Sequence, residues 1–234
     1  MNNQLNFQNI LDNGIFMNTS GSTGRPKTLF QSPKKLKAAN AVAREVQKID
    51  TRSKILTVCT LRHAGGLLAQ TLPAYEVGAQ KIDVIPFNAY SWVRQINNFT
   101  HSHLTPDMAR AVMKTKSFKT LNLEDIIITC GSDRVHSSII QSFIDRGCTF
   151  IANWGMTECG PIAINKTFVP DMEVEHTESI MGNMKYVETK VIDKELYIRG
   201  DITIFDSKDW YATGDLVLEE DNHMYYLGRK DGRE

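Results

Sequence analysis

The sequence has no excess of charge of one sign. Its 27 Lys and Arg residues equal its 27 Asp and Glu residues, so the formal net charge is zero. The longest basic cluster is Lys34, Lys35 and Lys37, a short run of the kind that usually solvates one face of a helix. A broad electrostatic surface for nucleic acid is therefore not expected.

Long apolar runs are absent as well. No stretch approaches the roughly 18 apolar residues of a membrane span. Residues 1–14 have neither the basic start nor the apolar run of a signal peptide. We therefore expect a cytoplasmic protein without a membrane partner.

Cysteine is scarce and irregularly spaced. Cys59, Cys130, Cys148 and Cys159 form no CxxC pair, so the sequence supports neither a zinc site nor a disulfide framework. We expect reduced and mostly buried thiols.

The remaining composition is that of a globular protein. Of the 234 residues, 41% are hydrophobic and 23% are charged, which disfavours the disordered, collagen-like and coiled-coil classes. At about 150 residues per domain, this length fits one large domain or one domain with a small partner.

Residues 54–152 alternate short apolar runs with helical periodicity. Ser32, as an N-cap, and Pro33, at the first helical position, mark one earlier helix. Strand–helix alternation with short connections predicts an α/β fold, a mostly parallel sheet flanked by helices. Strands are expected at 55–60, 82–86, 102–104, 126–130 and 149–152, and helices at 64–77, 90–98, 106–115 and 134–146.

After about residue 165 the helical periodicity disappears. Short strand patterns separated by Asp, Gly, Asn and Lys turns predict a small antiparallel β subdomain over 165–234, following a core over 1–164. The last seven residues, GRKDGRE, contain no apolar side chain, so they should be exposed or form a hinge. The strands are expected at 186–192, 195–199, 202–205, 215–218 and 223–227.

The segment TSGSTGRPK, from Thr19 to Lys27, is the strongest local signal. Its two glycines allow successive amide N–H groups to converge, its hydroxyls add donors, and its lysine adds a mobile positive charge. This pattern suits a triphosphate, although such a segment can also be an ordinary turn. It is not a P-loop of the GxxxxGK[ST] type, because Lys27 does not follow a glycine and residues 28–31, TLFQ, are expected to be extended before the helix begins at Ser32.

Three further segments carry polar groups of matching chemistry. NWGMTECG at 153–160 follows an expected strand, where an α/β sheet offers its ligand crevice. It contains Glu158, and Mg²⁺ commonly takes only one or two protein carboxylates. WYATGDLV at 210–217 brings Asp215, which could accept hydrogen bonds from a ribose, and GRKD at 228–231 brings Arg229. Each acid could also be a surface carboxylate, and Trp154 could be core.

Taken in this order, the four segments resemble the adenylate-forming superfamily of acyl-CoA synthetases, aryl-CoA ligases, luciferases and peptide-synthetase adenylation domains. TSGSTGRPK is similar to the family's phosphate loop, NWGMTE to its YGxTE motif, YATGD to its ribose motif and GRKD to its hinge motif. LRHAGGLLAQTLPAYEVGA resembles the segment that borders the acyl pocket. CGSD at 130–133 lies where the adenine-contacting loop sits, with Ser132 and Asp133 departing from the usual residues.

The resemblance implies that the protein binds ATP/AMP and Mg²⁺ and activates a small-molecule carboxylate as an acyl-adenylate. Lys27, Thr157, Glu158 and His63 would serve the reaction, with Glu158 binding Mg²⁺, Thr157 touching the α-phosphate and His63 facing the carboxylate. The implied nucleotide-binding residues are Thr19, Ser20, Gly21, Ser22, Thr23, Gly24, Lys27, Gly131, Trp154, Thr157, Asp215 and Arg229.

Relatives of this kind carry a large segment before the phosphate loop and a mobile domain after the hinge, and neither is expected within these 234 residues. Complete ligation to CoA would then need a partner domain. A nucleotide-binding or regulatory protein without turnover, and one part of a two-chain ligase, are alternatives. An apolar face left exposed would favour a homodimer.

The remaining histidines have less distinctive surroundings. His63 could be a buried histidine satisfied by a backbone group instead of a pocket residue. His101 and His103 alternate on one expected strand and share a face, but no third metal ligand is near them in sequence.

Overall fold

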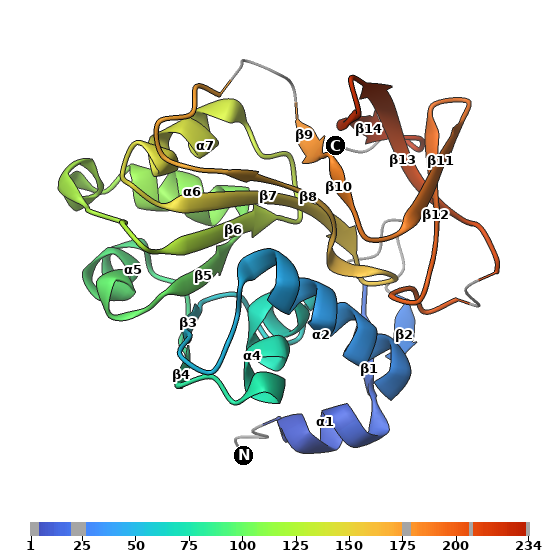
Figure 1. The fold of residues 1–234 in the computed structure, drawn as a ribbon, viewed down its shortest axis with the longest axis horizontal. Coiled ribbons are helices and arrows are strands. Elements are labelled where there is room, and N and C mark those ends of the chain that lie inside the picture. Colours follow the sequence, from blue (N-terminus) through green and yellow to red (C-terminus); the bar gives the residue numbers. More distant parts are fainter. Residues whose placement is uncertain (1–4, 20–26, 175–178, 206–207, 233–234) are drawn as a thin grey trace.

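The computed structural model describes residues 5–19, 27–174, 179–205 and 208–232, and its centre is a seven-stranded sheet (Figure 1). The strand order is β10-β8-β7-β6-β5-β3-β4, in which β4, β3, β5, β6 and β7 run parallel, β8 pairs antiparallel with β7, and β10 pairs antiparallel with β8. This confirms the predicted α/β fold. The strands are β3 (Lys54–Thr57), β4 (Lys81–Val84), β5 (His101–Leu104), β6 (Ile127–Gly131), β7 (Thr149–Met156), β8 (Gly160–Phe168) and β10 (Met184–Lys185).

Helices cover both faces of this sheet, which buries the apolar side chains that point from the strands to either side. One face packs on α5 (Ala89–Gln95), α6 (Pro106–Met113) and α7 (Ser137–Ile144) through a core that includes Trp92 and Phe143. The other side holds the cluster of Leu36, Leu67 and Leu72, contributed by α1 (Phe7–Asn13), α2 (Pro33–Gln47), α3 (Ala64–Gly66), η1 (Leu67–Thr71) and α4 (Leu72–Val77). Two short helices, η2 (Ile96–Asn98) and η3 (Lys116–Thr120), add Ile96 and Phe118 to the core on the α5, α6 and α7 face.

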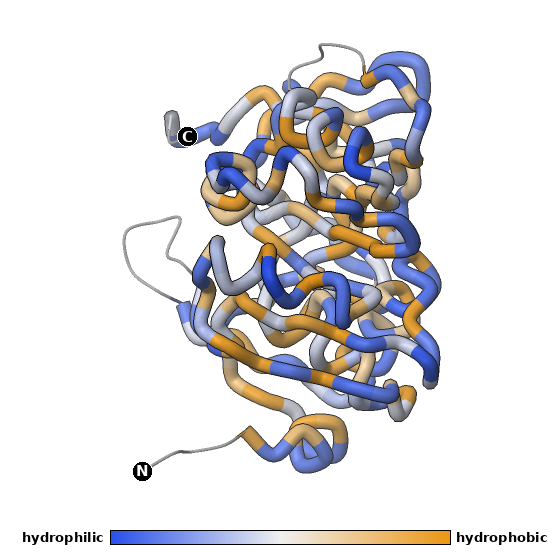
Figure 2. The backbone as a smooth tube through the Cα atoms, turned by 90° about the vertical axis from the view of Figure 1, so that its left-hand side faces the viewer, coloured by the Kyte–Doolittle hydropathy of each residue, from blue (hydrophilic) through white to orange (hydrophobic). Residues whose placement is uncertain are grey.

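Local chemistry explains where these elements begin. The Ser32 hydroxyl accepts a hydrogen bond from the Lys35 N–H at 3.3 Å, which caps α2 as predicted, and Pro33 follows at the first helical position. Thr105 caps α6 in the same way. Figure 2 shows the resulting pattern along the chain, where hydrophobic runs alternate with hydrophilic stretches.

The second layer is a five-stranded antiparallel sheet with the order β11-β12-β13-β14-β9. It packs against the larger sheet through a shared cluster that includes Ile164, Leu196 and Val217 (Figure 1). Strand β8 runs through residue 164, so the division at 164–165 is not visible as a break in the sheets and stays a prediction. The strands are β9 (Ile180–Gly182), β11 (Glu188–Ile192), β12 (Glu195–Arg199), β13 (Tyr211–Glu220) and β14 (His223–Arg229).

Several expectations need correction. Residues 202–205 form turns and bends, not a strand. Residues 160–168, for which no element was expected, form β8 because they fold back on β7 as a hairpin. The helix α1 and the hairpin of β1 (Ile15–Asn18) and β2 (Thr28–Gln31) were not anticipated either, apart from the extended character of residues 28–31.

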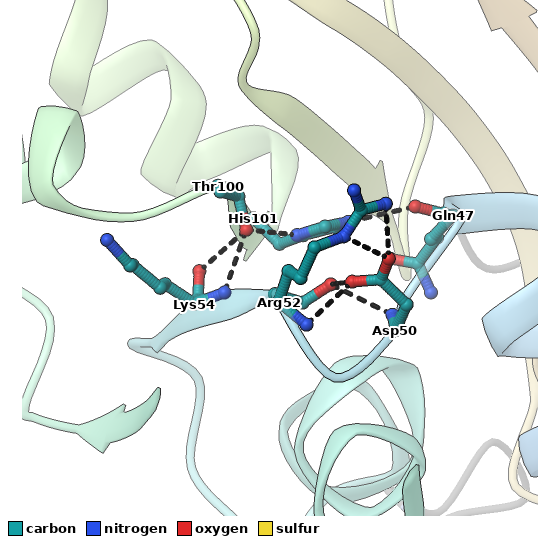
Figure 3. A network of polar contacts seen from close by, with 7 residues as sticks. Gln47, Asp50, Arg52, Lys54, Thr100 and His101 are labelled. Carbon is teal, nitrogen blue, oxygen red and sulfur yellow. Dashed lines mark hydrogen bonds and ion pairs between the residues drawn. The ribbon is translucent and has the colours of Figure 1, made fainter. Parts of the chain in front are cut away.

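A polar network in which Gln47 and His101 are buried joins α2 to the middle of the sheet (Figure 3). The two ring nitrogens of His101 contact the Thr100 hydroxyl at 2.7 Å and the Gln47 carbonyl at 2.8 Å. Both nitrogens are therefore engaged by the protein, which accounts for His101 without a metal. Burial lowers the pKa of neighbouring His103 to about 4, so this side chain is neutral at pH 7.

The four cysteines are free and buried, as predicted. Burial raises the pKa of Cys59 to about 11 and those of Cys148 and Cys159 to about 12, so the thiols stay protonated. Within the described ranges, no helix combines the length and the apolar character that a membrane crossing requires.

Candidate nucleotide site

Three of the predicted site residues lie at or after the carboxyl ends of parallel strands. Gly131 is the last residue of β6, Thr157 follows β7, and His63 lies in the connection after β3. Carboxyl ends of parallel strands meet at one edge of a sheet, and open α/β sheets bind ligands there. The topology therefore brings three separate sequence segments to the same edge.

A tight hairpin presents Thr157 and Glu158. Met156 pairs with Gly160 across it, and the Cys159 N–H donates to the Met156 carbonyl at 3.1 Å. Gly160 has a φ of 79°, the left-handed conformation that closes such short loops. A Cβ on Gly155 would lie 2.1 Å from the Gly160 carbonyl oxygen, so the hairpin requires glycine there.

Two neighbouring segments anchor the tip of this hairpin. The Gln31 side-chain amide, at the end of β2, donates to the Thr157 carbonyl at 3.2 Å. The Ile204 N–H donates to the Glu158 carbonyl at 2.8 Å. Sequence reasoning missed Gln31, although its position at the end of an extended segment just before α2 placed it beside the phosphate-loop motif.

Glu158 is a buried acid, with 7% of its surface exposed. Burial raises the pKa of its carboxyl group above the ordinary value, while its own backbone N–H and the charges of Lys27 and Arg229 act in the opposite direction. The Tyr211 hydroxyl is 3.5 Å from Oε1, and burial together with Glu158 raises the pKa of Tyr211 to about 12. Tyr211 stands in the YATGD segment but had not been singled out.

Asp215 is the best-connected acid of the site. Its Oδ1 accepts from Arg229 at 2.6 Å, and its Oδ2 accepts from the Trp154 indole at 3.0 Å. Burial raises the pKa of Asp215, and Arg229 opposes that rise. Burial alone would lower the pKa of Arg229, but Asp215 outweighs it and the net shift is upward. Three residues from three predicted motifs thus meet in one cluster.

The GRKD segment is not simply an exposed tail. Arg229 belongs to β14, is half-buried, and also donates to the Thr213 carbonyl at 3.1 Å. Gly214 allows this approach, because a Cβ there would lie 3.0 Å from the guanidinium. Among the described residues of this segment, Lys230, Asp231 and Gly232 match the predicted exposure.

The predicted phosphate loop connects β1 to β2. At its base the Thr19 N–H donates to the Lys27 carbonyl at 2.8 Å, and the Lys27 N–H donates to the Thr19 hydroxyl at 3.1 Å. The Lys27 side chain is exposed. Ser20, Gly21, Ser22, Thr23 and Gly24 lie outside the described residues.

His63 and Gly131 have different surroundings. The His63 side chain is exposed, which excludes the alternative of a buried histidine. Its carbonyl accepts from Gly66 and Leu67 at 3.1 Å, so the residue starts α3 through its backbone. Gly131 pairs with Asn153 and approaches it too closely for a side chain, since a Cβ would lie 2.3 Å from the Asn153 carbonyl oxygen.

The structure also corrects the interpretation of the lysine cluster. Lys34 and Lys37 are exposed, as a solvating run predicts, but Lys35 is 2% exposed. Lys35 lies one helical turn before Ala39 on the buried side of α2. That spacing of four residues was a signal available in the sequence.

The family model of the AMP-binding enzymes matches residues 12–203. The chain belongs to the AMP-binding enzyme family. Among curated members, an indoleacetate–CoA ligase of Aromatoleum aromaticum is 31% identical over 150 residues, which cover 62% of this chain and 29% of that enzyme. A 2-succinylbenzoate–CoA ligase of Staphylococcus aureus is 25% identical over an alignment of 245 residues, covering 95% of this chain and 49% of that enzyme. The chain spans half or less of the length of these relatives.

Solved structures of adenylate-forming enzymes share the fold. ATP-bound MatB from Rhodopseudomonas palustris superposes with a TM-score of 0.76 at 15% identity, over 92% of this chain and 48% of that one. The anthranilate CoA ligase AuaEII, solved with anthranoyl-AMP, gives a TM-score of 0.77 at 18% identity, over 92% and 47%. The fold predicted from the motifs is therefore that of this family.

Proposed function

We propose that this chain binds Mg·ATP and activates a small-molecule carboxylate, with formation of an acyl-adenylate and release of pyrophosphate. The observation that carries the proposal is the meeting of Trp154, Asp215 and Arg229 beside the Thr157–Glu158 hairpin in a member of the AMP-binding family. The relatives named above are CoA ligases of indoleacetate and 2-succinylbenzoate, which supports a carboxylate as the substrate.

In this proposal the cluster around Asp215 receives the nucleoside. Each Asp215 oxygen has a protein donor, and a carboxylate oxygen can accept a second hydrogen bond, so ribose hydroxyls can be added to the existing pair. Trp154 and Gly131 would line the nucleotide site. Asp215 and Arg229 thus form a preorganised ribose site whose charges compensate each other.

Glu158 suits Mg²⁺ by its chemistry. The Tyr211 hydroxyl approaches the Glu158 carboxylate at the long distance of 3.5 Å, which leaves lone pairs for a hard cation. The buried position of Glu158 raises its pKa, and a bound cation would favour the ionised form. When bound, Mg²⁺ would neutralise phosphate charge. Among the described residues no three His, Cys, Asp or Glu side chains gather as a metal site, so Glu158 would act with phosphate and water oxygens.

Lys27, Thr19 and the loop between them would hold the β- and γ-phosphates, Thr157 the α-phosphate, and His63 would face the carboxylate. Catalysis would rest on positioning and on neutralising developing charge. Transfer to CoA with the help of a partner domain, and a homodimer, are further proposals. The exposed aromatic pair Phe16 and Phe30, with ring centroids 4.9 Å apart, supports the homodimer.

The first experiment is titration calorimetry of ATP and AMP with Mg²⁺. Asp215→Ala should weaken both nucleotides, because it removes the ribose acceptor. Lys27→Ala should weaken ATP at least tenfold more than AMP, because AMP lacks the phosphates that Lys27 would meet. The matched control is Lys37→Ala, which removes another exposed lysine. Equal losses of ATP and AMP with Lys27→Ala would contradict the placement.

The second experiment is carboxylate-dependent exchange of pyrophosphate into ATP across a panel of carboxylates. We expect exchange by the wild type, a loss of at least 10²-fold with Glu158→Gln, and a smaller loss with Thr157→Val. Glu158→Gln keeps the size of the side chain and removes its charge. If ATP binds and no carboxylate supports exchange, the nucleotide-binding alternative replaces the enzymatic proposal.

A further inference from the structure

Lys35 is a buried lysine whose ammonium group makes a defined hydrogen bond. It lies in the first turn of α2, where the Ser32 hydroxyl accepts its backbone N–H. Its Nζ donates to the Gln31 side-chain oxygen at 2.5 Å, and that glutamine is fully buried. The Lys35 ammonium therefore donates a hydrogen bond to a neutral acceptor inside the protein.

Gln31 connects the Lys35 ammonium to the Thr157–Glu158 hairpin. Its amide nitrogen donates to the Thr157 carbonyl at 3.2 Å, so two hydrogen bonds join the ammonium to the residue proposed to meet the α-phosphate. Gly160, which closes the hairpin, lies beside this ammonium, since a Cβ there would be 3.8 Å from Nζ. A hydrogen bond from a charged donor is stronger than a neutral one and polarises the next in the chain.

The burial of this charge is costly. An ammonium loses its hydration on burial, and replacement of a buried ionic group by an apolar side chain of similar size is often neutral or stabilising. Burial lowers the pKa of Lys35 to about 8, while Cys159 and Glu158 act to raise it. Since this pKa lies above 7, the side chain is still mostly charged at neutral pH.

We propose that Lys35 is a positioning residue for the α-phosphate, acting through Gln31 to fix the Thr157 backbone and hence the direction of the Thr157 hydroxyl. The inference rests on the proposed nucleotide site. A residue in this role affects ligands that carry an α-phosphate and spares those that lack one.

The test compares AMP with adenosine by calorimetry in Lys35→Met, which keeps the length of the side chain and removes its charge. We expect about a tenfold loss of AMP affinity, unchanged adenosine affinity, and a melting temperature equal to or above that of the wild type. Gln31→Leu should give a similar loss of AMP affinity, and the double variant should lose little more because both residues act in one chain of contacts. Lys34→Met, next to it and exposed, is the matched control and should bind AMP as the wild type does.

The outcomes separate the two proposals. If the wild type binds neither AMP nor ATP, the proposed function fails and the inference on Lys35 falls with it. If the wild type binds AMP and Lys35→Met binds it equally well, only the inference on Lys35 is overturned. A parallel loss of adenosine and AMP, or a lowered melting temperature that explains the loss, shows a merely structural residue and overturns it as well. If Lys35→Met does not fold, the same comparison of AMP with adenosine in Gln31→Leu decides.

Discussion

At the scale of single residues, two buried side chains of opposite charge meet at the Thr157–Glu158 hairpin. Lys35 approaches it through Gln31, and Glu158 stands at its tip. Burial moves their pKa values in opposite directions, down for Lys35 and up for Glu158, because it disfavours the charged form of each. Each group therefore leaves a signature in the dependence of stability on pH.

We predict such a signature for Lys35. Its pKa is about 8 in the folded protein and 10.5 in the unfolded chain, so between these values the unfolded chain binds more protons. Stability then rises with pH. From pH 7 to pH 9.5 the free energy of unfolding of the wild type should rise by about 2 kcal/mol relative to Lys35→Met. Urea denaturation at both pH values measures this difference, and a difference that does not change with pH would contradict the assignment.

The sequence predicts some residues of the site and not others, for a physical reason. Glu158, Asp215 and Arg229 stand in motifs whose polar groups are close in sequence to glycines and aromatics, and their types alone suggest ligands. The spacing of Lys35 from Ala39 indicates its burial, but no local pattern indicates the contact of Gln31 with the hairpin, because the carbonyl that it meets lies more than 120 residues away. The meeting of Asp215 with both Arg229 and Trp154 likewise requires the packing of two sheets.

At the scale of elements, the hairpin of β7 and β8 sets the geometry of the site. Its turn brings Gly155 against the Gly160 carbonyl, with no space for a side chain. The parallel strands could be predicted, because their short apolar runs are bounded by helical patterns. Strand β8 could not, because its sequence GPIAINKTF begins with Gly and Pro and carries the polar run Asn165, Lys166 and Thr167 before Phe168, and only pairing with β7 defines it.

We predict that Gly155→Ala opens this hairpin. The added Cβ would lie 2.1 Å from the Gly160 oxygen and 2.5 Å from the Pro161 carbonyl carbon, both backbone atoms that cannot rotate away. The free energy of unfolding should fall by about 2–3 kcal/mol, and AMP affinity should fall with it. Gly78→Ala is the control, since no atom lies within 4 Å of its Cβ and only its φ of 72° costs about 1 kcal/mol. Thermal unfolding and calorimetry of both variants test this, and similar behaviour of the two would refute it.

At the scale of the whole molecule, the two sheets share an apolar cluster and are joined by polar contacts. Trp154 donates to Asp215, Ile204 donates to Glu158, and the Arg134 guanidinium donates to the Leu227 carbonyl at 3.3 Å. The sequence indicated two parts from a change in periodicity near residue 165. It contained no sign that buried residues from both parts would form one cluster, because such packing has no local pattern.

We therefore predict that the two sheets unfold as one cooperative unit. Leu196 of β12 is fully buried in the shared cluster, so Leu196→Ala should lower the free energy of unfolding by about 2–5 kcal/mol. Native-state amide hydrogen exchange measures the free energy of opening in each sheet separately, at the Val217 amide in β13 and at the Ile128 amide in β6. Both amides should lose protection by the same free energy, since global unfolding limits both. Loss at Val217 with Ile128 unchanged would show that the smaller sheet opens by itself, and it would make the predicted boundary at 164–165 a boundary of folding as well.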